Sequence, residues 1–277
     1  MNDNTVFEFD SGNPGPNILI FGGIHGNEHC GVKAIEMFME NLNSGRFTLL
    51  NGKVTFAFGN IPALKQNVRF IDKDMNRIFV DNNFDKFEGS SEYERVSFLK
   101  TLFEGKDAFL DLHSAKSPCL DFLISEEESL ILASELSSSF IVTGWKNFSE
   151  VAGDTENYAL GKGLKALTYE AGQHDDMISI ENSYSMILKF LSVHGMINYT
   201  FVKREAKVLN LKTLYLKTSE SDSLIPIIEN FTFVKKDELL IDGARQVRAP
   251  FDCYLVFPCD PKGIKIGETI CFLAELI

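Results

Sequence analysis

Two histidines and one glutamate have the residue types and the spacing of a metal site. His25 and Glu28 lie in "FGGIHGNEHCG", directly after the apolar run "NILIF", and His113 lies in "DLHS", at the end of another apolar run. Two neutral imidazoles and one carboxylate bind Zn²⁺ tetrahedrally and leave a fourth position for water. Each residue also has a structural alternative: His25 could bond to backbone, Glu28 could complement a helix N-terminus, and His113 could be a core histidine. The occurrence of all three together favours the metal site.

A further carboxylate could supply acid-base chemistry. Glu170 lies at the end of the apolar run in "KALTYEAG". A carboxylate at a strand end beside a metal can act as a general base, and a solvated or salt-bridged glutamate is the alternative. The remaining histidines have no comparable spacing, and we interpret them as structural or loop residues: His29, His174 and His194.

A polar segment between two predicted strands could bind an anion. It reads "NIPALKQNVRFIDKDMNRIF" and is neither a periodic helix nor a regular strand; it contains Arg69, Asn76 and Arg77. Guanidinium groups bind carboxylates through two parallel hydrogen bonds. The segment could therefore supply local positive charge in an acidic chain. Alternatively, the two arginines pair with Asp72 and Asp74.

Alternating strands and helices would position these residues, up to about residue 200. The predicted strands are "NILIFGG", "KVTFAFGN", "DAFLDLHS", "LDFLIS", "FIVTG" and "KALTYEAG". The predicted helices are "HCGVKAIEMFMENLN", "SSEYERVSFLKTLFEG", "EEESLILASELSSS" and "ISIENSYSMILKFLSVHG". Ser90 or Ser91 is expected to cap the second helix, with Glu94 completing a capping box. If the sheet is largely parallel, its strand ends bring the candidate metal ligands to one edge.

The pattern changes after residue 200. Residues 201–277 contain short strand-like runs separated by Gly, Pro, Asp and Lys, with no convincing helix. The runs are "KVLNLKTLYLKT", "IENFTFV", "CYLVFP" and "TICFLAEL". We therefore predict an α/β domain over residues 1–200 and a small β domain over residues 201–277.

Composition restricts the class of protein further. The 277 residues carry a net charge of −12, which would repel nucleic acid and anionic membranes. No apolar stretch is long enough to cross a membrane, and the polar start lacks the pattern of a signal peptide, so we expect a cytoplasmic protein. The five cysteines form no CxxC pair and are expected to be reduced, with Cys30 a small buried hydrophobe rather than a nucleophile. A homo-oligomeric state stays open.

Four motifs occur together in a characteristic order. The stretches "FGGIHGNEHCG", "NVRFIDKDMNRIF", "DLHS" and "YEAGQH" resemble the aspartoacylase/succinylglutamate desuccinylase family, relatives of the zinc carboxypeptidases. The resemblance covers about residues 18–174, and residues 201–277 are similar to the family's C-terminal β domain. It implies a three-layer α/β/α core of the zinc-carboxypeptidase type with a small C-terminal all-β domain.

The resemblance also implies a reaction. The family's three ligands to one Zn²⁺ per chain correspond to His25, Glu28 and His113. Glu170 matches the general base and later general acid, and Arg69 matches the residue that polarises the scissile carbonyl. Asn76 and Arg77 match the pair that holds a substrate carboxylate. The expected activity is hydrolysis of a small N-acyl amino acid to a carboxylate and a free amino acid, through attack by zinc-bound water.

One position departs from the family pattern. Members that act on acetylated aspartate carry a further arginine upstream of the catalytic glutamate, and the ungapped register places Leu160 there; Lys162 or Lys165 could substitute if the loop is shifted. This puts recognition of an aspartate side chain in doubt. Two alternative functions are a zinc carboxypeptidase for short peptides and a non-catalytic binding protein that retains the fold.

Overall fold

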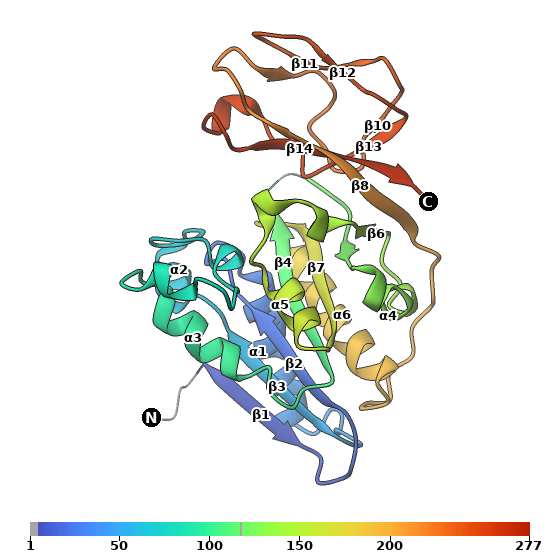
Figure 1. The fold of residues 1–277 in the computed structure, drawn as a ribbon. Coiled ribbons are helices and arrows are strands. Elements are labelled where there is room, and N and C mark those ends of the chain that lie inside the picture. The colour runs from blue at the N-terminus through green and yellow to red at the C-terminus, as the bar shows by residue number, and fades with distance from the viewer. Residues whose placement is uncertain (1–4, 117) are drawn as a thin grey trace.

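The computed structural model describes residues 5–116 and 118–277. Within them lies a sheet of eleven strands in the order β1-β3-β2-β4-β7-β5-β6-β8-β14-β13-β10 (Figure 1). In that order its strands are Val6–Asp10, Lys53–Phe58, Asn17–Gly22, Ala108–Ala115, Lys165–Gln173, Phe122–Ile124, Phe140–Thr143, Lys207–Leu216, Thr269–Leu276, Cys253–Val256 and Phe233–Val234. Strands β3, β2, β4 and β7 are parallel to one another. Their carboxyl ends therefore meet at one edge, as predicted.

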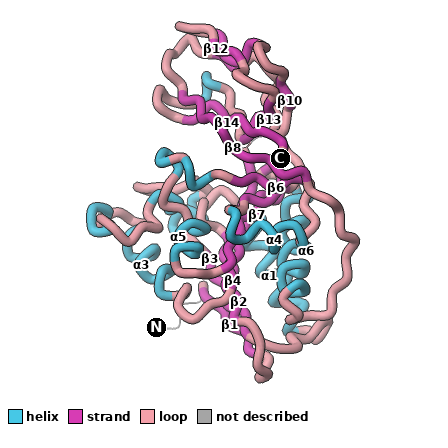
Figure 2. Tube along the Cα trace, turned by 45° about the vertical axis from the view of Figure 1, so that its right-hand side comes forward, coloured by secondary structure: helices cyan, strands magenta, loops and turns pink. Residues whose placement is uncertain are grey.

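Helices cover both faces of the parallel part of the sheet (Figure 2). On one face lie α1 (Cys30–Asn43), α4 (Leu130–Glu135) and α6 (Met177–Val193), and α3 (Tyr93–Thr101) and α5 (Thr155–Gly161) lie on the other. Strands covered on both sides need apolar residues at successive positions. The run "NILIF" satisfies this, since the four apolar residues of the run are fully buried in β2. This three-layer core confirms the predicted fold class.

The beginning of α3 differs from the prediction. The residue before the helix is Glu92, and its side chain does not cap the helix. Ser91 instead donates from its backbone N–H and its hydroxyl to Asp72, and the Ser90 hydroxyl donates to the Phe87 carbonyl. The predicted serine capping box is therefore wrong, because a tertiary contact takes the serine that the local pattern assigned to the helix.

Several elements were not predicted. The arginine-containing segment includes a short helix, α2 (Ile61–Gln66), which Asn60 caps by accepting a hydrogen bond from the Ala63 N–H. The edge strand β1 and the helix α5 were also absent from the prediction. All of them are short, so their periodicity is weak.

The C-terminal strands continue the same sheet. Strand β8 pairs in parallel with β6 through residues 207–210 and antiparallel with β14 through residues 209–216. A second sheet of the described chain has the order β12-β11-β9. Its strands are Val247–Arg248, Leu239–Asp242 and Ser223–Leu224. Residues 201–277 thus form a small strand-rich part beyond the core (Figure 1), and the domain boundary at residue 200 stays a prediction.

Two further observations concern the whole described chain. None of its helices is both long and apolar enough to cross a membrane. All five cysteines are free, as expected.

Candidate metal centre

The three candidate ligands meet at the carboxyl edge of the parallel strands. His25 and Glu28 lie in the loop between β2 and α1, and His113 lies in the neighbouring strand β4. All three side chains are buried. Nδ1 of His25 and Nδ1 of His113 each lie 2.8 Å from a different carboxylate oxygen of Glu28. One ligand atom from each residue lies within 4.8 Å of the others, which is close enough for all three to contact one ion.

The opposite nitrogen of each histidine faces a carboxylate. Nε2 of His25 lies 3.0 Å from Oδ1 of Asp74. Nε2 of His113 lies 2.9 Å from Oδ2 of Asp111, an ion-pair distance, although the angle is not that of a hydrogen bond. A carboxylate beside Nε2 favours a proton there and leaves the Nδ1 lone pair for a metal, which is the arrangement typical of zinc-binding histidines.

The charges around the centre also suit a cation. Burial would raise the pKa of Glu28, but the imidazoles of His25 and His113 hold it well below its usual range. Burial lowers the pKa of His113, but Asp111 and Glu28 outweigh this and raise it well above its usual range. The site therefore favours positive charge between these groups, and His25, Glu28 and His113 fit a divalent metal ion such as zinc.

Glu170 lies next to the three candidate ligands. It faces His113 across the β4–β7 pair and is buried. Burial raises its pKa to about 8, although the charge of His113 lowers it in part. Within the described residues, its Oε2 atom has no hydrogen-bond partner. A buried carboxyl with a free oxygen and a pKa near neutrality can both accept and donate a proton.

Arg69 contacts the same group of residues. Its Nε and Nη2 atoms donate to Oδ2 of Asp74 at 3.1 and 2.9 Å, and Nη1 lies 3.6 Å from Oε1 of Glu28. The Arg69 carbonyl accepts a hydrogen bond from the Gly26 N–H. A Cβ atom at Gly26 would lie 2.2 Å from the carbonyl carbon of Ala63 in α2, so the close approach of this loop to the helix requires glycine.

Asn76 and Arg77 lie in a 3₁₀ turn, Met75–Arg77, directly after Asp74. Oδ1 of Asn76 accepts a hydrogen bond from the Thr155 N–H at 3.4 Å. Nη1 of Arg77 donates to the Asn76 carbonyl at 2.6 Å. Burial lowers the pKa of Arg77. The negative charge of Asp74 raises it in part, and the positive charge of Arg69 lowers it further. Arg77 therefore shares the electrostatic environment of the centre.

Leu160, Lys162 and Lys165, the residues considered for the position of the additional arginine, lie outside the centre. Leu160 packs against the apolar cluster under α3 and α5. Lys162 donates to Oδ2 of Asp81, and Lys165 donates to the Glu128 carbonyl. Both lysines thus have partners outside the centre.

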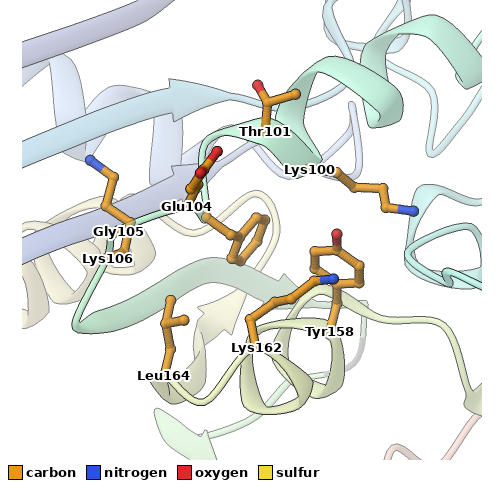
Figure 3. A pocket seen from close by; sticks show the side chains of 9 residues that line it. Lys100, Thr101, Glu104, Gly105, Lys106, Tyr158, Lys162 and Leu164 are labelled. Carbon is orange, nitrogen blue, oxygen red and sulfur yellow. The ribbon is translucent and has the colours of Figure 1, made fainter.

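A hollow of about 460 Å³ lies away from these residues (Figure 3). Lys106 and Leu164, which line it, precede β4 and β7, so it lies at the amino ends of the strands that carry His113 and Glu170 at their carboxyl ends. It is therefore separate from the candidate metal centre.

Cys30 and the other histidines have local partners. The Cys30 thiol is buried, donates to the His113 carbonyl at 3.4 Å, and has its pKa raised to about 11 by burial. It therefore stays protonated, in line with the predicted structural role. The imidazole of His29 lies 2.9 Å from Oδ1 of Asn67, and that of His174 lies 2.9 Å from Oγ of Ser114. The imidazole of His194 lies 2.7 Å from the Phe190 carbonyl oxygen.

Two carboxylates of the centre were not predicted. Asp74 was expected only as an alternative partner for an arginine, and Asp111 was not among the candidate residues. Asp111 and His113 are two residues apart in β4, so their side chains lie on the same face of the strand. A buried carboxylate at that spacing from a metal-ligand candidate was the signal that could have identified it.

Comparison with known proteins agrees with this architecture. The fold and the candidate centre define a three-layer α/β protein with a buried His-Glu-His group at the carboxyl edge of its sheet. Residues 14–177, more than half of the chain, match the model for the succinylglutamate desuccinylase/aspartoacylase catalytic domain. The chain belongs to this family.

The relatives are distant in sequence. A succinylglutamate desuccinylase from Pseudoalteromonas atlantica is 24% identical over 282 residues, covering 91% of this chain and 79% of that protein. An aspartoacylase from Xenopus tropicalis is 31% identical over 125 residues, covering only 42% of this chain and 39% of that protein.

Solved structures share the fold over nearly the whole chain. The succinylglutamate desuccinylase of Vibrio cholerae superposes with a TM-score of 0.81 at 19% identity, covering 98% of this chain and 85% of that one. An ectoine utilization protein from Ruegeria pomeroyi, solved with product bound, gives a TM-score of 0.77 at 16% identity, covering 97% and 88%. At these identities the likeness establishes the fold.

Proposed function

We propose that the chain is a zinc-dependent amidohydrolase that cleaves a small N-acyl amino acid into a carboxylate and a free amino acid. The observation that carries this proposal is the buried contact of Glu28 with Nδ1 of both histidines, beside Glu170. Membership of a family whose named relatives are desuccinylases and an aspartoacylase supports an enzyme acting on amides.

One zinc ion per chain would be held by His25, Glu28 and His113. When bound, zinc acts as a Lewis acid on a carbonyl and lowers the pKa of a coordinated water. Asp74 and Asp111 would keep the two imidazoles in the tautomer and orientation that binding needs.

Glu170 would move the proton. As a carboxylate it takes a proton from the attacking water, and as a carboxylic acid it gives that proton to the departing amine. Burial raises its pKa to about 8 in the metal-free centre, which favours the carboxylic acid, and a bound cation would favour the carboxylate.

The arginines and Asn76 would bind the substrate. Arg69 would stabilise the negative charge that develops on the carbonyl oxygen. Asn76 and Arg77 would hold the carboxylate of the amino acid, since a guanidinium provides a two-point hydrogen bond to that group.

A substrate screen tests the proposal. The zinc-loaded protein would be assayed with acetyl, succinyl and formyl amino acids and, in parallel, with unblocked dipeptides and tripeptides. Zinc-dependent release of free amino acid from the acylated set is the expected result. Cleavage of the peptides alone would indicate a carboxypeptidase instead. Stoichiometric zinc without hydrolysis of either set would indicate a binding protein.

A further inference from the structure

A buried carboxylate outside the centre binds the segment that carries Arg69 and Asp74. Glu92, directly before α3, is fully buried. Its carboxylate accepts hydrogen bonds from three successive backbone N–H groups and from a side-chain amide. The partners are Ile71 at 2.7 Å, Asp72 at 3.3 Å, Lys73 at 3.0 Å and Nδ2 of Asn60 at 3.0 Å.

A second contact joins the same two elements in the opposite direction. Oδ2 of Asp72 accepts hydrogen bonds from the N–H and the hydroxyl of Ser91, at 2.8 and 2.7 Å. Ser91, just before α3, thus donates to Asp72 of the segment, and the backbone of residues 71–73 donates to Glu92. This reciprocal pairing fixes residues 71–73 relative to the helix.

The segment has little apolar burial of its own. Residues 65–70, 72 and 73 are exposed. Packing therefore contributes little to its position, and hydrogen bonds must define it. Glu92 also supplies the acceptor for three consecutive backbone donors, and each of these hydrogen bonds involves a charged group.

The fixed residues lie between two groups of the centre. Arg69 precedes Ile71 by two residues, and Asp74 follows Lys73 directly. Asp74 in turn contacts both Arg69 and Nε2 of His25. A shift of this stretch would move Arg69 and Asp74 together, away from the metal-ligand candidates.

We propose that Glu92 is a positioning residue, which sets the place of Arg69 and Asp74 by binding the backbone of residues 71–73. The catalytic part of this proposal rests on the proposed amidohydrolase function, whereas the structural part does not. Glu92 itself does not contact substrate.

Tryptic cleavage of the folded protein tests the structural part without any assay of activity. Glu92→Gln keeps the length of the side chain but replaces one acceptor oxygen by a donor. Glu94→Gln is the matched control, since Glu94 is exposed on the same helix and the charge change is the same. Cleavage after Arg69 and Lys73 should be about tenfold faster in Glu92→Gln, as local opening becomes easier, and unchanged in Glu94→Gln. An unchanged rate in Glu92→Gln overturns the proposal.

A double-mutant cycle tests the catalytic part. Glu92→Gln should lower kcat/KM by about ten- to a hundredfold when Arg69 is present, a part of what an oxyanion donor is worth. In an Arg69→Ala background the same substitution should cost at least about fivefold less, since only its effect through Asp74 then remains. Equal losses in both backgrounds would mean general damage and would overturn the proposal.

Two safeguards keep these outcomes distinct. If Glu92→Gln does not fold, Glu92→Asp replaces it, because it keeps the charge and withdraws the carboxylate by one methylene; the same cleavage and kinetic results are then required of it. If the wild-type protein hydrolyses no acylated amino acid, the proposed function fails, while the cleavage rates still decide whether Glu92 fixes the segment.

Discussion

His113 and Glu170 face each other on the neighbouring parallel strands β4 and β7. One is a candidate metal ligand and the other is the candidate proton carrier. Because the backbone ladder of two central strands sets their separation, neither group depends on a flexible loop for its position. The two residues are therefore suitable for separate tests of metal binding and of proton transfer.

Removing one ligand should remove most of the metal affinity. His113→Ala takes away one of the three candidate ligands, so zinc affinity should fall by more than about a hundredfold, beyond the loss typical of a changed supporting residue. Elemental analysis and competition with a chelator would measure this, with His194→Ala as the control, since His194 bonds locally to the Phe190 carbonyl. Undiminished stoichiometric zinc in His113→Ala would contradict the assignment.

Glu170→Gln should separate catalysis from metal binding. The variant should retain zinc and lose roughly 10² to 10⁴ in turnover, which is the usual contribution of a positioned general base. Zinc analysis and steady-state kinetics on the same preparation would measure both quantities. Loss of the metal would make Glu170 a ligand, and near-normal turnover would make it structural.

The two carboxylates that face Nε2 of the histidines should strengthen metal binding. Asp111→Asn and Asp74→Asn should each weaken zinc binding by about ten- to a hundredfold, because the imidazole loses the partner of its Nε2 atom. Asp81→Asn is a suitable control, since Asp81 pairs with lysines outside the centre. Wild-type affinity in both test variants would show that these carboxylates do not support the ligands.

The substrate should need one free carboxylate. Amidating the α-carboxylate would remove the charged partner of the partly buried Arg77, at a cost of about 1.5 to 3 kcal/mol, the order of magnitude of a hydrogen bond to a charged group. A second carboxylate should matter less, because Leu160, Lys162 and Lys165 lie outside the centre. Hydrolysis rates of acetylated Asp, Glu, Met and Leu and of their α-amides would measure this. A preference of several orders of magnitude for acetylaspartate would mean that another cation binds the aspartate side chain.

A buried glutamate should make stability fall with rising pH. Burial, with Asp154 adding to it, raises the pKa of Glu156 well above its usual 4.5. Above pH 4.5 the unfolded chain loses this proton while the folded chain keeps it, so folding becomes less favourable until the folded pKa is passed. Glu156→Gln should therefore raise the Tm at pH 8 and leave it nearly unchanged at pH 4. Thermal unfolding at the two pH values measures this, and an equal shift at both would contradict the explanation.

The sequence was sufficient where local pattern decides structure. Strands β2, β4 and β7 were predictable because both of their faces are buried and their apolar runs are continuous. His25, Glu28 and His113 could be recognised because each follows or ends such a run. The structure then brings them to one point.

The rest depended on contacts between distant parts of the chain. Ser91 has the local pattern of a helix cap, yet it donates to Asp72, nineteen residues away. Asp74 looked like an arginine partner, and it is one, but it also faces His25, forty-nine residues away. Nothing local to these residues encodes such pairings.

Strand β8 belongs at once to the ladder with β6 and to the ladder with β14. Swinging residues 201–277 away as a rigid body would break the hydrogen bonds between β6 and β8. Under the proposed function, substrate entry and product exit would therefore use the loops at the edge of the sheet rather than a hinge between the two parts of the chain. Turnover should respond more to the stiffness of those loops than to any hinge between the two parts of the chain.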